Sequence, residues 1–116
     1  MIRKTLILCI CLMLLLSACG TKKEDIKKII LENMQKIDEV SDMTSSNPYD
    51  YIKNEYYDNI VSLGNDAVPV LEEMYRTGEL KGLHAFIAAI AVQEITGADL
   101  EWSTAEEFFS SREETQ

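Results

Sequence analysis

The chain has 116 residues, and its 20 Asp and Glu outnumber its 11 Lys and Arg, which gives a net charge of −9 at neutral pH. This length is enough for one domain, and a hydrophobic content of 47% excludes a wholly disordered chain. The acidic balance argues against a nucleic-acid-binding protein, because phosphates are bound by Lys and Arg.

The N-terminal segment has the three parts of an export signal. Arg3 and Lys4 come first, an uncharged and mostly apolar stretch follows at residues 5–16, and the small residues Ser17 and Ala18 precede Cys19. An apolar helix of this length covers about 18 Å, less than the roughly 30 Å of a bilayer's hydrocarbon core. A membrane-spanning anchor is therefore the weaker interpretation of this segment.

The string Leu16-Ser17-Ala18-Cys19 resembles the lipobox of bacterial lipoproteins. That resemblance implies that residues 1–18 are a signal peptide that is removed, and that the Cys19 thiol carries a diacylglyceryl group. It places the mature protein on the extracytoplasmic face of the cell membrane. In a host with two membranes, Gly20 after the cysteine favours the outer membrane. The alternative is an ordinary secretory signal in which Cys19 has no role.

Cleavage before Cys19 leaves a mature chain of 98 residues and removes two positive charges, so that its net charge is −11. Cys9 and Cys11 leave with the signal peptide, and a lipidated Cys19 leaves no free thiol for a disulfide, a metal site or a nucleophile. We expect a short tether at residues 19–23, one helical domain at 24–112 and a frayed tail at 113–116.

The first expected helix, residues 24–40, carries apolar residues at spacings of three and four. Four lysines lie in or before its first turns, and they are expected either to approach anionic lipid headgroups or to form a solvated face: Lys22, Lys23, Lys27 and Lys28. A second helix is expected over residues 48–63, because Asn47 can cap it, Pro48 suits its first turn and Gly64 can end it.

Three further helices are expected in the C-terminal half. Asn65 or Asp66 is expected to cap a helix over residues 67–77, with Pro69 in its first turn. Residues 80–96 are apolar nearly all round, which predicts a central helix that ends at Gly97. The string Ser103-Thr104-Ala105-Glu106 matches a capping box for a last short helix. Since no alternating apolar and polar run is present, the expected fold class is all-α, a small bundle of about five helices.

Residues 63–71, Leu-Gly-Asn-Asp-Ala-Val-Pro-Val-Leu, resemble the first-helix motif of HEAT-type repeats. The alanine-rich residues 85–91 and the ending Ile95-Thr96-Gly97 are similar to the second helix of such a repeat. The resemblance covers about one repeat, residues 60–100, and implies a short stack of helical hairpins. Helices 24–40 and 48–63 would then cover its faces, and Trp102, Phe108 and Phe109 would close it. His84 or Lys81 stands where second helices often carry Arg.

Catalytic and metal-binding patterns are scarce in this sequence. His84 is the only histidine, so a site with two histidines is excluded, and a structural or solvent-exposed role is favoured. The acidic pairs, such as Glu72-Glu73, point in different directions on a helix, which favours solvated faces over a paired-carboxylate site. We therefore expect no enzyme activity, no cofactor and no metal.

Four tyrosines lie close together at Tyr49, Tyr51, Tyr56 and Tyr57. A continuous helix would place Tyr49 and Tyr56 on its apolar stripe and would leave Tyr51 and Tyr57 partly exposed. Together with three acids that surround them in the sequence, these two rings form a candidate partner-binding site that suits a basic protein segment or a cationic ligand: Tyr51, Tyr57, Asp50, Glu55 and Asp58. The simpler alternative is that amphipathic rings cover the edges of a small core.

Three functional hypotheses follow from the sequence. The first is a lipid-anchored, non-enzymatic protein-interaction module with a protein partner and no nucleic acid. The second is an immunity or accessory lipoprotein of a toxin system or an envelope complex. The third and weakest is a small hydrolase or lyase.

Overall fold

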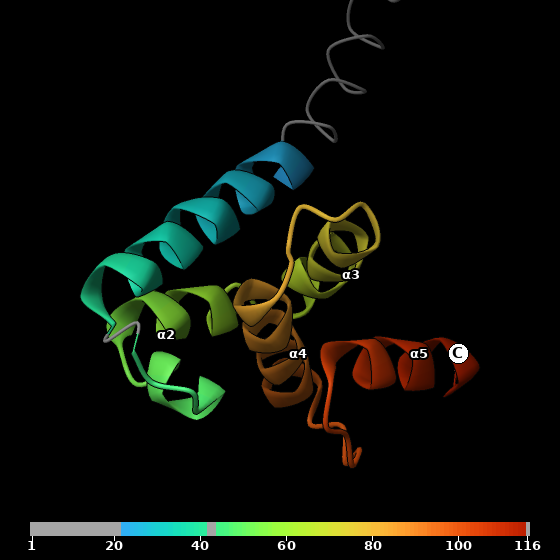
Figure 1. The fold of residues 1–116 in the computed structure, drawn as a ribbon. Coiled ribbons are helices and arrows are strands. Elements are labelled where there is room, and N and C mark those ends of the chain that lie inside the picture. Colours follow the sequence, from blue (N-terminus) through green and yellow to red (C-terminus); the bar gives the residue numbers. More distant parts are fainter. Residues whose placement is uncertain (1–21, 42–43, 116) are drawn as a thin grey trace, which may run out of the picture.

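The computed structural model of the chain describes residues 22–41 and 44–115. The predicted signal peptide, Cys19 and the first part of the tether lie outside the described residues. Within the described ranges all regular structure is helical, in five α-helices and two short 3₁₀ turns (Figure 1). The predicted all-α class, a small helical bundle, is thus confirmed.

The N-terminal helix covers residues 22–40 and packs one apolar stripe against the rest of the protein. Its inward side chains follow spacings of three and four and are at most 9% exposed: Ile26, Ile30, Met34 and Ile37. In Figure 1 the helix runs beside the other elements and its C-terminal end lies next to α2 (Glu55–Val61). Lys22 and Lys23 are already helical, so the helix begins two residues before the expected residue 24, within the expected short tether.

The expected continuous helix over residues 48–63 is wrong, because two asparagine caps divide it. The Asn47 side chain accepts a hydrogen bond from the Tyr49 N–H and starts η1 (Pro48–Tyr51). Residues 52–54 are not helical. The Asn54 side chain then accepts from the Tyr57 N–H at 2.9 Å and starts α2.

The next helix, α3 (Val68–Arg76), follows directly on η2 (Gly64–Ala67). Pro69 lies in the first turn of α3, as predicted, but neither Asn65 nor Asp66 caps the helix through its side chain. The chain passes from η2 into α3 without a break, and the Val68 N–H donates to the Asn65 carbonyl within that turn. A side-chain cap is therefore not needed at this point.

The central helix is α4 (Leu83–Thr96), which contacts η1, η2, α2, α3 and α5. Half of its residues are buried: Ala85, Ile87, Ala88, Ala89, Ile90, Ala91 and Val92. Gly97 ends it with a left-handed φ of 68°, and the Gly97 N–H donates to the Gln93 carbonyl. The predicted central position and the predicted C-terminal stop are both confirmed.

The last helix, α5 (Ala105–Thr115), starts with a capping box that lies one residue later than predicted. Thr104 Oγ1 accepts from the Glu107 N–H, and the Glu107 carboxylate accepts from the Ser103 N–H. The expected fraying from residue 113 is also wrong, since the helix continues through Thr115. An ion pair of 2.9 Å between Arg112 and Glu72 of α3 holds this end of α5.

Candidate functional site

The candidate site around Tyr51 and Tyr57 does not have the predicted exposure. Each of these side chains is only 3% exposed, so the expectation that they are available at the surface is wrong. The Tyr51 hydroxyl donates to the Ser45 carbonyl at 2.7 Å, and the Tyr57 hydroxyl donates to the Glu94 carboxylate of α4. Burial, followed by that bond, raises the pKa of the Tyr57 hydroxyl. Both rings therefore belong to the core.

The non-helical residues 52–54 explain why Tyr51 and Tyr57 are buried while Tyr49 is exposed. A continuous helix would have placed Tyr49 inside, whereas η1 and α2 have separate orientations. Tyr49 is instead 48% exposed, and its ring meets Phe86 of α4 edge-on at 5.9 Å between centroids. Tyr56 is half-buried against the core.

The three acids of the candidate site remain at the surface. Asp50 follows Tyr49 in η1, accepts from the Ser45 hydroxyl and lies 3.9 Å from the Lys53 ammonium. Glu55 and Asp58 are exposed in the first turn of α2, where negative charge complements the helix dipole. The three carboxylates of the candidate site are thus exposed, whereas its two tyrosine rings are buried.

A different set of aromatic side chains lies at the surface. We call Tyr49, Phe86 and Trp102 the aromatic row. Phe86 lies between the other two, 5.9 Å from Tyr49 and 4.8 Å from Trp102. Trp102 and Phe86 are half-buried, and Trp102 packs on the buried Phe108 at 5.2 Å. Three separate segments contribute to this row, so no local periodicity in the sequence could have identified it.

Hydrogen bonds fix the position of Trp102. Its indole N–H donates to Gln93 Oε1 at 2.9 Å. The amide group of Gln93 donates in turn to the carbonyls of Ala98 and Leu100, at 3.2 and 3.1 Å. One side chain of α4 thereby holds both the indole ring and the chain that leads to it.

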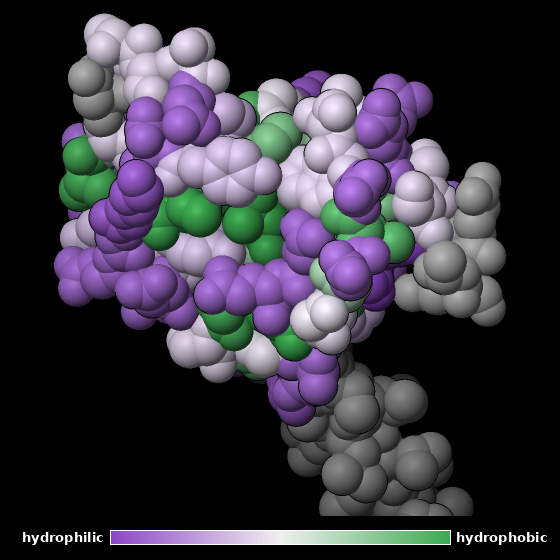
Figure 2. Space-filling model, turned by 90° about the horizontal axis from the view of Figure 1, so that it is seen from below, coloured by the Kyte–Doolittle hydropathy of each residue, from purple (hydrophilic) through white to green (hydrophobic). Residues whose placement is uncertain are grey.

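The segment that carries Phe86 and Trp102 is acidic. Residues 82–111 contain no Lys or Arg, and their five acids are all exposed: Glu94, Asp99, Glu101, Glu106 and Glu107. Figure 2 shows the molecule from below Figure 1, the side on which η1 and the 97–104 connection lie. On this side hydrophobic residues gather in a band that is bordered by hydrophilic ones.

The opposite end of the molecule carries ion pairs between the N-terminal helix and the other elements. Lys22 lies 3.2 Å from Asp66 of η2, Lys23 pairs with Glu73 of α3, and Lys27 lies 2.6 Å from Glu79. The bond to Glu79 raises the pKa of the Lys27 ammonium, and the bond to Lys23 lowers the pKa of the Glu73 carboxyl. These lysines therefore bind acids of the same chain; Lys28 lies 4.0 Å from Glu32 of its own helix.

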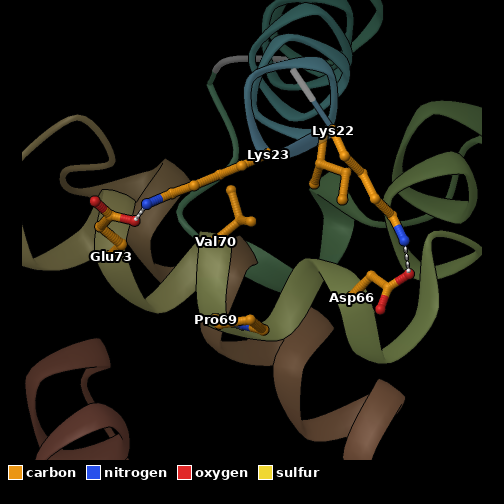
Figure 3. A pocket seen from close by; sticks show the side chains of 7 residues that line it. Lys22, Lys23, Asp66, Pro69, Val70 and Glu73 are labelled. Atoms are coloured by element: carbon orange, nitrogen blue, oxygen red, sulfur yellow. Dashed lines mark ion pairs between the residues drawn. The ribbon is translucent and has the colours of Figure 1, made fainter. Parts of the chain in front are cut away.

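An open pocket of about 320 Å³ lies between the first turns of the N-terminal helix and α3. Ile26, Pro69 and Val70 supply its apolar lining. In Figure 3, Lys22 and Lys23 extend on the two sides of Val70, and each reaches a carboxylate. The pocket is thus an apolar hollow between two ion pairs.

His84 occupies a structural position. Its Nε2 lies 2.9 and 3.0 Å from the two carboxylate oxygens of Asp38, which joins the start of α4 to the N-terminal helix. This fits the structural role favoured from the sequence. Within residues 22–41 and 44–115, no group of three or more His, Cys, Asp or Glu is arranged to hold a metal ion.

Among the described helices, none combines the length and the apolar character needed to cross a membrane. Neither a scan against protein-family models nor searches of curated proteins and of solved structures found a match for this chain.

Proposed function

We propose that this chain is a bacterial lipoprotein, anchored by a diacylglyceryl group on Cys19 to the extracytoplasmic face of the membrane, and that its helical domain is a non-enzymatic protein-interaction module. The observation that carries the anchoring is the string Leu16-Ser17-Ala18-Cys19, which follows a basic and then an apolar segment. In a host with two membranes, the outer membrane is the proposed location.

The placement of the N-terminal helix determines which end of the domain such an anchor would hold. Helical structure is present at Lys22, only three positions after Cys19, and the helix is packed against the domain through Ile26 and Ile30. Three residues reach at most about 11 Å. A lipid on Cys19 would therefore hold the end of the domain that carries Lys22, Lys23 and the adjoining pocket close to the bilayer.

Two observations support an interaction module. His84, the one histidine, joins α4 to the N-terminal helix through Asp38, and Tyr57 is buried in the core, so both side chains have structural positions. The string that resembles a HEAT-type repeat spans η2 and the first half of α3, and α3 packs against the alanine-rich α4. We propose that this pair is one HEAT-like hairpin, covered by its neighbouring helices. Repeats of this type present surfaces rather than catalytic groups.

Anchoring is tested by replacing the cysteine. The full-length chain and its Cys19→Ser variant are expressed in a bacterial host that is fed radiolabelled palmitate, and Cys11→Ser serves as the matched control. We expect label and membrane association for the wild type and for Cys11→Ser, and loss of both for Cys19→Ser. Equal labelling of wild type and Cys19→Ser would contradict the proposal.

The interaction function is tested in the native host by crosslinking. The wild-type chain is compared with a variant in which the three exposed acids are neutralised: Asp50→Asn, Glu55→Gln and Asp58→Asn. We expect one envelope protein to be crosslinked by the wild type and lost in the variant. A partner encoded as a toxin would favour the immunity hypothesis, and the absence of any crosslinked protein from a membrane-bound wild type would contradict a protein-interaction module.

A further inference from the structure

We infer that the aromatic row, Tyr49, Phe86 and Trp102, is the docking surface for an arginine-containing basic segment of an extracytoplasmic protein. The compartment of that partner rests on the proposed function. The chemistry of the surface rests on the structure alone.

The row offers aromatic area that is already held in place. Tyr49 is 48% exposed and contacts Phe86, which contacts Trp102 at 4.8 Å. Gln93 fixes the indole, and the Asn47 cap together with Pro48 fixes the turn that carries Tyr49. A partner that binds here does not have to order these rings, so little conformational entropy is lost on its binding.

The charge around the row selects a cationic partner. Asp50 is adjacent to Tyr49, and Asp99 and Glu101 precede Trp102; all three acids are exposed. Between residues 82 and 111 no Lys or Arg opposes them. Lys53 is the nearest cation in sequence to η1, and it already lies beside Asp50. A basic segment would therefore meet the carboxylates of Asp99 and Glu101 beside Trp102, while Lys53 partly offsets the charge of Asp50 beside Tyr49.

Arginine matches this combination better than lysine does. Its planar guanidinium can stack on the exposed ring of Tyr49 while its N–H groups bind a neighbouring carboxylate. A lysine ammonium can bind the carboxylate, but it is more strongly hydrated and cannot stack. The surface thus combines the two features that an arginine side chain uses at once.

A second copy of this chain is a poor occupant. Two acidic faces would repel each other, since the chain carries a net charge of −9. Six of the lysines that could offset this charge are already paired with acids of their own chain: Lys22, Lys23, Lys27, Lys28, Lys36 and Lys53. The row also lies away from the anchored end: in Figure 1 the residue 22 end of the N-terminal helix is at the top, while η1 and the 97–104 connection are below. A membrane-held protein would present this side to other envelope proteins.

Trp102 is the only tryptophan in the chain, so its fluorescence reports directly on this surface. The full-length protein, purified in a neutral detergent, is titrated with a short synthetic peptide in which arginine alternates with serine. Peptides with lysine or with glutamate in place of arginine are the controls. We expect a saturable change in fluorescence that weakens with salt, with the order arginine, then lysine, then no binding for glutamate.

Two variants locate the binding. We expect Tyr49→Ala, and separately Asp99→Asn with Glu101→Gln, to weaken the arginine peptide about fivefold or more. The matched controls lie on the N-terminal helix and should bind as the wild type does: Leu31→Ala, and Asp25→Asn with Glu32→Gln. Equal weakening by the control pair would show that net charge alone attracts the peptide and would overturn the inference. So would equal affinity for the arginine and lysine peptides, or no binding at all.

Sedimentation of the same samples tests the alternative occupant. A dimer that is lost in Tyr49→Ala would assign the row to a second copy and would overturn the basic partner. Because the assay uses detergent-purified protein, it does not depend on lipidation. Failure of peptide binding with palmitate labelling intact rejects the docking surface alone, and loss of labelling with binding intact rejects the anchoring alone.

Discussion

The N-terminal helix should unfold together with the rest of the domain, and one pair of neighbouring residues tests this. Ile30 is fully buried against the domain, whereas Leu31, next to it in the same helix, is 42% exposed. Ile30→Ala removes apolar surface and leaves a cavity, which costs about 3 kcal/mol at a fully buried site. Leu31→Ala removes a similar volume at the surface, where substitutions change stability by roughly 0.5 kcal/mol or less.

The assay is urea unfolding followed by the fluorescence of Trp102, which packs on Phe86 and Phe108 and hydrogen-bonds to Gln93. These contacts belong to α4 and α5, so the probe is separate from the substituted helix. A domain of this size has a stability of roughly 5–15 kcal/mol and an m-value near 1 kcal/mol per M in urea. Ile30→Ala should therefore lower the urea midpoint by about 3 M and still leave a folded protein.

The comparison of the two variants decides the outcome. If Ile30→Ala and Leu31→Ala unfold at the same urea concentration, the helix does not share the cooperative unfolding that Trp102 reports. Residues 22–40 would then be a separate element, and the orientation of the domain on a membrane would no longer follow from the position of Cys19.

Two further predictions concern contacts between helices. Arg112→Ala, which removes the partly buried pair with Glu72, should lower stability by about 1–3 kcal/mol, while the exposed Arg76→Ala should change it by less than about 0.5 kcal/mol; equal losses would contradict the pairing. The Tyr57 pKa is raised above its ordinary value of 10.0, so the folded state keeps a proton that the unfolded state loses at high pH. Stability should therefore fall as the pH rises above 10, and Tyr57→Phe should reduce that fall whereas Tyr49→Phe should not, as measured by urea midpoints across alkaline pH.

Local signals in the sequence were enough for much of the fold. Gly97 ends α4 because a glycine accepts the left-handed conformation there, and Pro69 fits the first turn of α3, where its missing N–H is not needed. The absence of a polar face in residues 83–96 correctly predicted the central helix, because only a core position can cover such a surface.

The tyrosine assignment failed because it depended on the phase of one continuous helix. A helix over residues 48–63 places Asn54 in its interior, although asparagine is among the residues that most favour an N-cap. Its cap on the Tyr57 N–H restarts the helix in a new orientation, so that Tyr57 turns inward and Tyr49 stays outside. Recognising Asn54 as a cap would have divided the segment correctly, but it would not have shown which ring meets Phe86.

The contacts that define the two ends of the molecule could not be predicted in this way. Lys27 and Glu79 are 52 positions apart, and Arg112 and Glu72 are 40 apart. Helical periodicity relates residues three or four apart, so it assigns a residue to a face and leaves the partner of that face open. The four lysines could therefore be assigned to a cationic helix face, while the carboxylate partners of Lys22, Lys23 and Lys27 required the tertiary structure.

The packing of the N-terminal helix changes what a lipid on Cys19 would do. A long irregular tether would let the domain take any orientation, because flexible chains separate the positions of the parts that they join. Here the helix is held to the domain by the buried side chains of Ile26 and Ile30. Exposed ion pairs alone would not hold it, because such pairs contribute little to stability. An anionic bilayer would attract the ammonium groups of Lys22 and Lys23. These groups are instead paired with carboxylates of the same chain. Packing rather than charge would then set which end faces the membrane, and the aromatic row would point away from it at any salt concentration.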